Sequence, residues 1–440
     1  MFAMCDHDHP LSYDPSGCRL LILSIPPLIS LMQHIVGLTK MATSFSPVRV
    51  SHAFSNDSLE KATAHTGVSL SDEGELGYDL PSDVADRLVK RTEMRVSQVL
   101  AQSMYVQENC RLYELPRFHR EEIDIGELIA YGGFSNVHEV HGFHCPNPLP
   151  DRSSGKTKRR YIVKNLNPKL AFNPKKLVVG AKDLVMEAHF LSSLDHENII
   201  ELRGWSAAGI GGFSETGRAD GFFLVFDRLS ETLSRRITTW RERAKEAKKG
   251  SLMKSRANLR MQLFSERMQC AIDIASAVEY LHSKRIIYRD LKPANIGFDD
   301  DGTLKIFDFG LAVELPEGTD PDSTFNLAGN TGTSRYMAVE VIRKHPYNCK
   351  ADVFSFSILL WELMALCKPY EGLVGQQVKE CVSVFGERPA IPRTWPTHLR
   401  RLLRRGWNES IVDRPFMAEV KDTLVKLHEA SAKPAKLFSK

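Results

Sequence analysis

The most constraining feature of the chain is the segment at residues 287–295 (IYRDLKPAN), which is followed by LKIFDFG at residues 304–310. These segments supply two carboxylates, Asp290 and Asp308, and one side-chain amide, Asn295. Hard oxygen ligands of this kind suit Mg²⁺, which binds through one or two carboxylates together with substrate phosphates. Asp308 follows a mostly apolar run, which predicts a carboxylate at the end of a short buried strand. The pattern therefore predicts a site for phosphate and metal.

The two carboxylates need not have the same role. Asp290 has Lys292 two residues after it, so it is placed to accept a proton from a hydroxyl while Lys292 balances negative charge. A lone RD dipeptide or DFG tripeptide is usually a surface turn. Together and in this order, the two segments resemble the catalytic loop and the metal loop of eukaryotic protein kinases. The resemblance implies that Asp290 and Lys292 serve catalysis and that Asn295 and Asp308 bind Mg²⁺.

Bulk properties agree with an ordinary globular protein. At 440 residues the chain is long for one domain, which favours a two-lobed catalytic unit with a flanking region. A net charge of +4 over this length gives no argument for a nucleic-acid partner. None of the eight cysteines forms a CxxC pair, so we expect a reduced, cytoplasmic setting without structural zinc or a disulfide framework.

The N-terminal residues 1–40 leave several interpretations open. Residues 20–38 are apolar and nearly long enough to cross a bilayer, but Pro26 and Pro27 would break a helix in the middle. Membrane association through this segment, as an anchor or in a receptor-like kinase, is an alternative that we do not favour. A targeting sequence or a start at Met41 also fits. The CDHDH run at residues 5–9 is interpreted as a solvated tail rather than a metal site.

Residues 41–120 are interpreted as a linker followed by a helical region. The helix is expected to begin at Ser82-Asp83, with a polar residue at Thr92. Its expected apolar positions are Val84, Leu88, Val96, Val99 and Leu100. Two further stretches are expected at the surface: residues 206–221 as a flexible loop, and the basic residues 241–260 as a solvated helix and loop.

Residues 121–228 resemble the smaller lobe of a kinase. The segment at residues 129–137 (IAYGGFSNV) is similar to the glycine-rich loop that covers nucleotide phosphates, although Ala130 and Ser135 replace two of the family's glycines. Lys164, in a predicted strand, matches the family's ATP-binding lysine. Glu187, on the following predicted helix, matches the glutamate that holds this lysine. The resemblance therefore implies that Lys164 contacts the α and β phosphates and that Glu187 positions it.

The resemblance also implies an adenine pocket. Phe226 would be the gatekeeper at its back, and residues 227–229 would be the hinge whose backbone binds adenine. Family members place a small residue before the lysine and an apolar one after the loop asparagine, whereas this chain has Ile162 and Gly297. We hypothesise that the large side chain of Ile162 compensates for the missing side chain at Gly297, so that the two residues still enclose adenine. The full set of expected ATP-binding residues is Ile129, Gly132, Val137, Ile162, Lys164, Phe226, Asp227, Leu229 and Gly297.

Residues 229–428 resemble the larger, helical lobe, and residues 429–440 form a short tail. Tyr288 occupies the place of the family's catalytic-loop histidine, where we expect it to pack under Phe309. In the activation segment, the match implies that Thr333 contacts the catalytic loop. Thr331 is the better candidate for phosphorylation.

Three further residues are expected to be structural. Glu340 follows a tyrosine in the segment GTSRYMAVE, and Arg414 lies in VDRP, so the resemblance implies a buried ion pair between them. Asp352 is expected to hold the backbone of the catalytic loop.

The sequence thus predicts an α+β, two-lobed protein kinase fold, with a small antiparallel sheet and one helix in the N-lobe and a mainly helical C-lobe. It is similar to serine/threonine kinases of the tyrosine-kinase-like group. We expect ATP-dependent, Mg²⁺-dependent transfer of phosphate to serine or threonine of protein substrates, because Lys292 is typical of that class. Tyrosine or dual specificity is a minor alternative. A pseudokinase that binds partners without catalysis is the alternative from another class, supported by the departures from the family pattern at Ala130, Ser135, Tyr288, Ile162 and Val339.

Overall fold

The computed structural model describes residues 79–146, 149, 160–249, 253–317, 320 and 322–432. The chain divides into two units, residues 1–54 and 55–440, and every described residue belongs to the second unit. The apolar segment 20–38, the CDHDH run, the linker up to residue 78 and residues 433–440 of the tail lie outside the described residues. Within the described part of the chain, no helix combines the length and apolar character needed to span a bilayer.

A six-stranded sheet forms the smaller lobe, with the strand order β1-β5-β6-β4-β3-β2. Its strands are β1 (Arg117–Phe118), β2 (Ile123–Tyr131), β3 (Ser135–Phe143), β4 (Tyr161–Leu166), β5 (Leu202–Ser206) and β6 (Phe223–Asp227). All neighbours pair antiparallel except β1 and β5, which pair parallel. The sheet is therefore mixed, because residues 117–118 add an edge strand that the sequence did not indicate.

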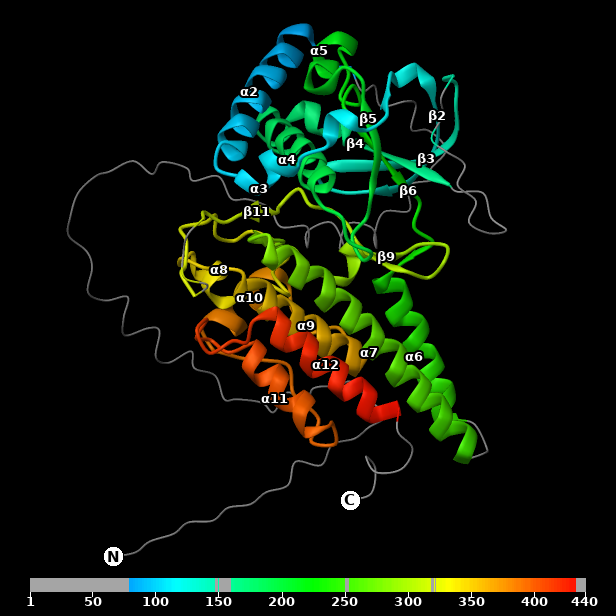
Figure 1. The fold of residues 1–440 in the computed structure, drawn as a ribbon, viewed down its shortest axis with the longest axis vertical. Helices are drawn as coiled ribbons and strands as arrows, with labels where there is room; N and C mark the ends of the chain where they lie inside the picture. Colours follow the sequence, from blue (N-terminus) through cyan, green and yellow to red (C-terminus); the bar gives the residue numbers. More distant parts are fainter. Residues whose placement is uncertain are drawn as a thin grey trace, which may run out of the picture. The chain divides into compact units, whose positions relative to one another are not determined.

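Helix α4 (Pro174–Ser193) packs on this sheet and carries Glu187. Its start is defined locally, since Pro174 occupies the first turn and the Asn173 side chain accepts a hydrogen bond from Lys176 N. Helix α2 (Ser82–Leu100) lies beside α4 (Figure 1). The smaller lobe thus has more helices than the single one expected.

Helix α2 differs from the expectation at two residues. Its N-cap is Pro81 rather than Ser82, and no side chain caps it. Thr92, expected on a polar turn, is fully buried together with Ala85, Leu88 and Val96. These residues recur every three or four positions, so they share the face that packs against α4. The Thr92 hydroxyl has no hydrogen-bond partner among the described residues, so its burial costs about 1–3 kcal/mol that the apolar packing of this face must outweigh.

The prediction of a flexible loop at residues 206–221 is wrong. The segment contains the short helices η6 (Gly209–Gly211) and α5 (Gly212–Thr216), and Phe213 is fully buried. A Cβ on Gly212 would lie 2.1 Å from the carbonyl oxygen of Gly221, so the glycines serve close backbone approach rather than mobility. Asp220 is also buried and is bonded to Arg218 at 2.8 Å.

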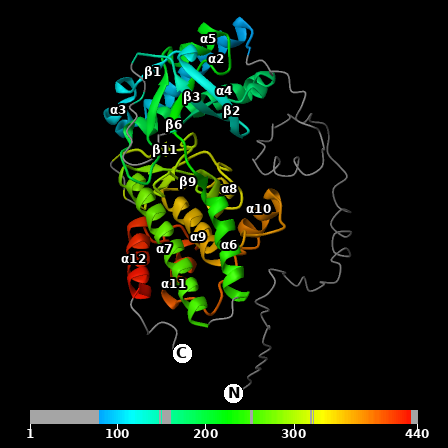
Figure 2. The ribbon, with the colours of Figure 1, turned by 90° about the vertical axis from the view of Figure 1, so that its right-hand side faces the viewer.

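The larger lobe is mainly helical (Figure 2), and its longest helix, α7, packs against α6, α9 and α12. Its helices are α6 (Leu233–Lys249), α7 (Met253–Ser283), α8 (Val339–Arg343), α9 (Lys350–Ala365), α10 (Gly375–Ser383), α11 (Thr397–Gly406) and α12 (Met417–Ala432). Helix α9 is buried on nearly all sides. These elements confirm the predicted two-lobed α+β fold.

Short strands position the loops between the lobes. Strand β7 (Glu231–Thr232) pairs with β9 (Ile296–Phe298), which pairs with β10 (Leu304–Ile306). Strand β8 (Ile286–Ile287) pairs with β11 (Val313–Glu314). Because β8 and β9 flank residues 288–295 and β10 and β11 flank residues 307–312, the two polar loops of the sequence emerge side by side.

Candidate active site

The loop after β8 is held by a single carboxylate from α9. Asp352 Oδ2 accepts a hydrogen bond from Tyr288 N at 2.8 Å, and its Oδ1 accepts one from Arg289 N at 2.9 Å. Arg289 has a φ of 69°, a conformation that is unfavourable for a side chain with a Cβ. The buried Asp352 side chain therefore stabilises a backbone turn that local preference would not produce.

Asp290 lies at the centre of a hydrogen-bond network. Its Oδ1 accepts bonds from Thr333 N at 2.9 Å and from Thr333 Oγ1 at 2.8 Å. Its Oδ2 accepts bonds from Lys292 Nζ at 2.8 Å and from Asn295 Nδ2 at 3.0 Å. The geometry brings together Asp290, Lys292, Asn295 and Thr333, as the sequence pattern suggested. Burial raises the pKa of Asp290, against the opposing effect of the Lys292 ammonium.

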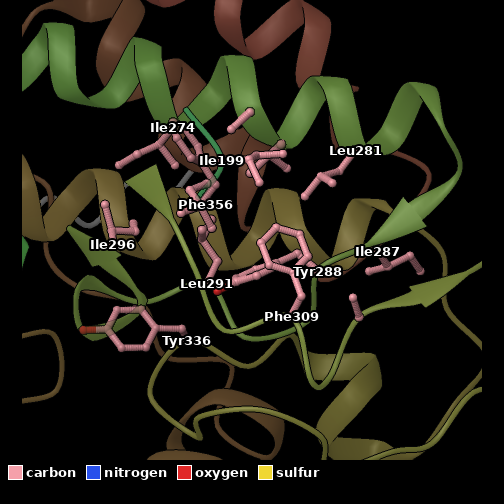
Figure 3. Packing of buried hydrophobic residues seen from close by; sticks show 14 of the residues in the cluster. Ile199, Ile274, Leu281, Ile287, Tyr288, Leu291, Ile296, Phe309, Tyr336 and Phe356 are labelled. Carbon is pink, nitrogen blue, oxygen red and sulfur yellow. The ribbon is translucent and has the colours of Figure 1, made fainter. Parts of the chain in front are cut away.

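The two loops are joined by aromatic packing (Figure 3). The rings of Tyr288 and Phe309 are in edge contact, and both side chains are fully buried. The Tyr288 hydroxyl also donates a hydrogen bond to the carbonyl oxygen of Phe307. Tyrosine at this position therefore adds a polar link between the loops to the packing that an aromatic ring supplies.

Lys164 connects three elements. Its Nζ lies 2.7 Å from Glu187 Oε2 on α4 and 2.9 Å from Asp308 Oδ1 after β10. The Lys164 and Glu187 side chains are nearly buried, whereas the Asp308 side chain is 44% exposed. Asp308 is thus open on one side of the ion pair, and its φ of 71° places it at a sharp turn.

The charges of this cluster reinforce each other. Burial disfavours the charged form of Lys164, but the carboxylates of Asp308 and Glu187 outweigh it and raise the pKa of Lys164. Burial also opposes ionisation of Asp308, but Lys164 lowers the pKa of Asp308 below its usual range. Burial raises the pKa of Glu187. Asp308 is therefore the carboxylate best kept ionised at neutral pH.

The oxygen donors fit a magnesium ion with bound phosphate. Asn295 uses Nδ2 to bond Asp290, which leaves its amide oxygen as the acceptor, and Asp308 offers an exposed carboxylate. Mg²⁺ uses few protein ligands and retains water and phosphate oxygens. Among the described residues, no cluster of three or more acidic, histidine or cysteine side chains could hold a metal without such help.

The hairpin of β2 and β3 carries the glycine-rich segment. Gly132 N donates to Ser135 O at 2.7 Å, which closes the turn, while Ile129 is 42% exposed and Val137 is half-buried. The side chain of Asn167, a residue not singled out from the sequence, donates to Gly132 O at 2.9 Å. Asn167 follows β4 directly, so this bond ties the hairpin turn to the end of the strand that carries Lys164.

The residues expected to line an adenine pocket come from the sheet of the smaller lobe and from β9 with the segment before β7. Ile162 on β4 is opposite Phe226 on β6, and Phe226 is buried. Asp227 pairs with Arg203 at 2.6 Å, a partner that the sequence did not suggest. A Cβ on Gly297 would lie 2.6 Å from Leu229 Cδ1. The volume missing at Gly297 is therefore occupied by Leu229, and exchange with Ile162 alone does not account for it.

The activation segment is attached to the catalytic loop through Arg289. Its side chain donates to Leu311 O at 2.6 Å and to Tyr347 Oη at 3.3 Å, and Tyr347 in turn donates to Ala328 O at 2.8 Å. Tyr347 was not anticipated, because nothing in its local sequence marks it. Thr331 is partly exposed, and its Oγ1 donates to Ala328 O at 3.0 Å.

Glu340 and Arg414 form a bidentate buried pair. Arg414 Nη1 and Nη2 each lie 2.7 Å from an oxygen of Glu340, and Arg414 is 1% exposed. Arg414 also donates to the carbonyl oxygens of Asn408 and Lys350. Its charge and its donors are therefore satisfied, which is the condition for a buried ion pair to persist.

Comparison with known proteins identifies the family of this chain. A protein-family model described as "Protein tyrosine and serine/threonine kinase" matches residues 123–424. The chain is 35% identical over 184 residues to the serine/threonine/tyrosine-protein kinase HT1 of Arabidopsis thaliana, covering 40% of this chain and 46% of the relative. It is 40% identical over 158 residues to the serine/threonine-protein kinase STY46 of the same plant, covering 36% and 26%.

A third relative is the dual specificity protein kinase shkB of Dictyostelium discoideum, which is 40% identical over 159 residues, covering 36% of this chain and 24% of the relative. The matched regions thus span between about a quarter and a half of these three relatives. The fold and the polar loops define a protein of the kinase class. The chain belongs to the protein tyrosine and serine/threonine kinase family, as the sequence predicted.

Proposed function

We propose that the protein is an ATP- and Mg²⁺-dependent kinase that phosphorylates serine or threonine residues of protein substrates. The observation that carries the proposal is the position of Lys164 Nζ, which bonds Glu187 and Asp308 at the same time. Phosphoryl transfer requires mainly positioning and charge stabilisation, and this cluster provides fixed charges of both signs.

In this proposal each group has a stated role. Lys164 binds the α and β phosphates, Glu187 holds Lys164, and Asn295 with Asp308 holds Mg²⁺, which neutralises phosphate charge when bound. Asp290 orients the substrate hydroxyl and accepts its proton, and Lys292 stabilises the transferred phosphate. The bond between Lys292 Nζ and Thr333 Oγ1, 3.0 Å long, places both groups beside Asp290. Serine/threonine specificity is supported by the lysine at position 292, which is typical of that class.

The remaining proposals concern the adenine pocket, the activation segment and the cellular setting. The backbone of residues 227–229 would bind adenine between Ile129, Val137 and Ile162, and Phe226 would limit the depth of the pocket. Thr331 would be a phosphorylation site. No disulfide joins any two of the six described cysteines, which supports a reduced, cytoplasmic setting.

The test is phosphate incorporation from labelled ATP with Mg²⁺ into mixed peptides containing serine, threonine or tyrosine. We expect incorporation at serine and threonine by the natural chain and a loss of at least about a hundredfold in an Asp308→Ala variant, since metal and phosphate positioning are lost. Binding of ATP by both proteins with no transfer by either would instead support a pseudokinase. Comparable labelling of tyrosine would indicate dual specificity.

A further inference from the structure

Glu314 makes a contact that the proposed chemistry does not explain. It ends strand β11, six residues after Asp308, and it is 7% exposed. Its Oε1 accepts a hydrogen bond from Tyr105 N at 2.8 Å, and its Oε2 accepts one from Val106 N at 3.1 Å. Both donors lie in the first turn of helix α3 (Met104–Asn109), where backbone N–H groups have no partner within the helix. One carboxylate thus joins segments 209 residues apart.

The segment of α3 is also bonded to the end of α4. Tyr105 Oη donates to Ser193 O at 3.2 Å, and Arg111 N donates to Ser192 O at 3.2 Å. Cys110 Sγ lies 3.2 Å from Ser192 Oγ. Val106 is fully buried beside these contacts. The segment from Tyr105 to Arg111 is therefore attached to the last turn of α4, five to six residues after Glu187.

The backbone of Glu314 pairs with β8, the strand that leads into the catalytic loop. In the β8–β11 pair, Glu314 is opposite Ile286 and Val313 is opposite Ile287, which precedes Tyr288 directly. Leu315 N donates to Arg285 O at 2.8 Å, and Arg285 Nη2 donates to Leu315 O at 2.6 Å. Glu314 is therefore fixed relative to Asp290, while its side chain bonds the segment that is fixed to α4.

A contact of this kind has an energetic consequence. A buried carboxylate that loses its donors must be desolvated without compensation, which is costly. Displacement of α3 and α4 from β11 would leave Glu314 in that state. The two N–H bonds consequently favour the arrangement in which α3 is held against β11 and α4 is held by α3. Glu187 reaches Lys164 in this arrangement.

We propose that Glu314 is a positioning residue for the Lys164–Glu187 pair, which it stabilises from a distance by capping α3 and so holding α4 in place. The segment of residues 104–111 is then part of the catalytic unit. This inference rests on the proposed roles of Lys164 and Glu187.

The test compares the full chain with its Glu314→Ala and Glu314→Gln variants. The control is Glu317→Ala, an exposed carboxylate three residues further along the same segment. The measurements are kcat, the KM for ATP, and hydrogen exchange of peptides from α3 and α4. We expect Glu314→Ala to lower kcat by about tenfold, because a small displacement of Glu187 misplaces Lys164. Exchange should rise in both helices, and the KM for ATP should change less than kcat.

A milder variant acts on the other end of the connection. Tyr105→Phe removes the bond to Ser193 and leaves both N–H donors to Glu314 in place. If α3 links Glu314 to α4, the two substitutions act on the same connection. The fold-decrease in kcat of the double variant Glu314→Ala/Tyr105→Phe should then be smaller than the product of the fold-decreases of the two single variants. Since Glu314→Gln retains one strong acceptor, it should fall between the natural chain and Glu314→Ala. If Glu314→Ala unfolds, the single variants Tyr105→Phe and Glu314→Gln still decide the test. Each should raise exchange in α4 and lower kcat, and unchanged exchange of α4 in both would overturn the inference.

The outcomes separate this inference from the proposed function. Faster exchange confined to α3, with unchanged kcat and unchanged exchange in α4, would reduce Glu314 to a local cap and overturn the inference. If the natural chain transfers no phosphate, the proposed activity fails, but exchange in α4 still decides whether Glu314 holds that helix. Unchanged exchange of α4 in Glu314→Ala overturns the inference in either case.

Discussion

The ring of Tyr288 lies edge-on to the ring of Phe309, with their centroids 5.1 Å apart and an interplanar angle of 68°. The same tyrosine donates its hydroxyl hydrogen to the carbonyl oxygen of Phe307. One side chain therefore supplies both an apolar and a polar contact between the catalytic loop and the metal loop. The two contacts can be separated by substitution.

Tyr288→Phe should lower the free energy of unfolding by about 0.5–1.5 kcal/mol, because the hydrogen bond to the partly buried carbonyl of Phe307 is lost. Tyr288→Ala should cost about 3–5 kcal/mol, because a cavity replaces the ring. Urea denaturation measures both values. Tyr113→Phe, at a tyrosine that is 71% exposed, is the control and should be nearly neutral. Equal stability of Tyr288→Phe and the natural chain would show that the hydroxyl contributes nothing.

Gly297→Leu should weaken binding of a non-hydrolysable ATP analogue by about 1–3 kcal/mol, because the added side chain meets Leu229 and the carbonyl oxygen of Glu231. Adding Leu229→Ala should recover part of the loss, since the two side chains compete for one space. Calorimetric titration with the analogue measures each affinity. Gly142→Leu is the matched control, as a Cβ at Gly142 meets no atom within 4 Å. Unchanged affinity of Gly297→Leu for the analogue would refute the proposal that Gly297 lines the adenine pocket.

Glu340→Gln should lower the free energy of unfolding by about 3–5 kcal/mol, because it leaves the charge of Arg414 buried without its partner. The double variant Glu340→Gln/Arg414→Met should cost less than the sum of the single variants. Chemical denaturation of the four proteins gives the coupling. The exposed pair of Arg343 and Glu409 provides a comparison, and Glu409→Gln should cost less than about 1 kcal/mol. Strict additivity at Glu340 and Arg414 would contradict the prediction.

Stability should also depend on pH through Glu362 in α9. It accepts a hydrogen bond from Tyr336 Oη at 2.6 Å, and burial raises the pKa of Glu362 to about 7, despite the opposing effects of Tyr336 and Arg335. Because the folded pKa exceeds the unfolded value, the folded state binds the proton more tightly. The resulting stabilisation is complete below the unfolded pKa of about 4.5 and is lost as the pH rises through about 7.

Between about pH 5 and about pH 8, the free energy of unfolding should therefore fall less in Glu362→Gln than in the natural chain. The difference between the two decreases should be about 3 kcal/mol at most. Urea midpoints at the two pH values measure this difference. The exposed Glu371, changed to Gln, is the control and should leave the pH dependence intact. An identical pH dependence in Glu362→Gln and the natural chain would exclude Glu362 as the source.

Sequence patterns predicted the regular elements well and failed where packing overrode local preference. The strand from Ile123 follows from alternation of apolar and polar residues, whereas the strand from Tyr161 and the helix carrying Glu187 were expected from the family resemblance. The segment at 206–221 is rich in glycine, which is typical of loops, yet its glycines allow a tight backbone crossing. Composition alone does not distinguish a glycine used for mobility from one used for close approach.

The sequence by itself determined which chemical groups are present and in which order. These groups are the side chains of Lys164, Asp290, Lys292, Asn295 and Asp308, and their order is typical of one family. The tertiary structure decided which of them meet. Lys164 reaches Asp308 across 144 residues, and Glu314 reaches Tyr105 across 209. Such bonds depend on the packing of whole helices and strands, whereas periodicity and capping report only on neighbours within a few residues. For that reason the role of residues 104–111 could be found only in the folded chain.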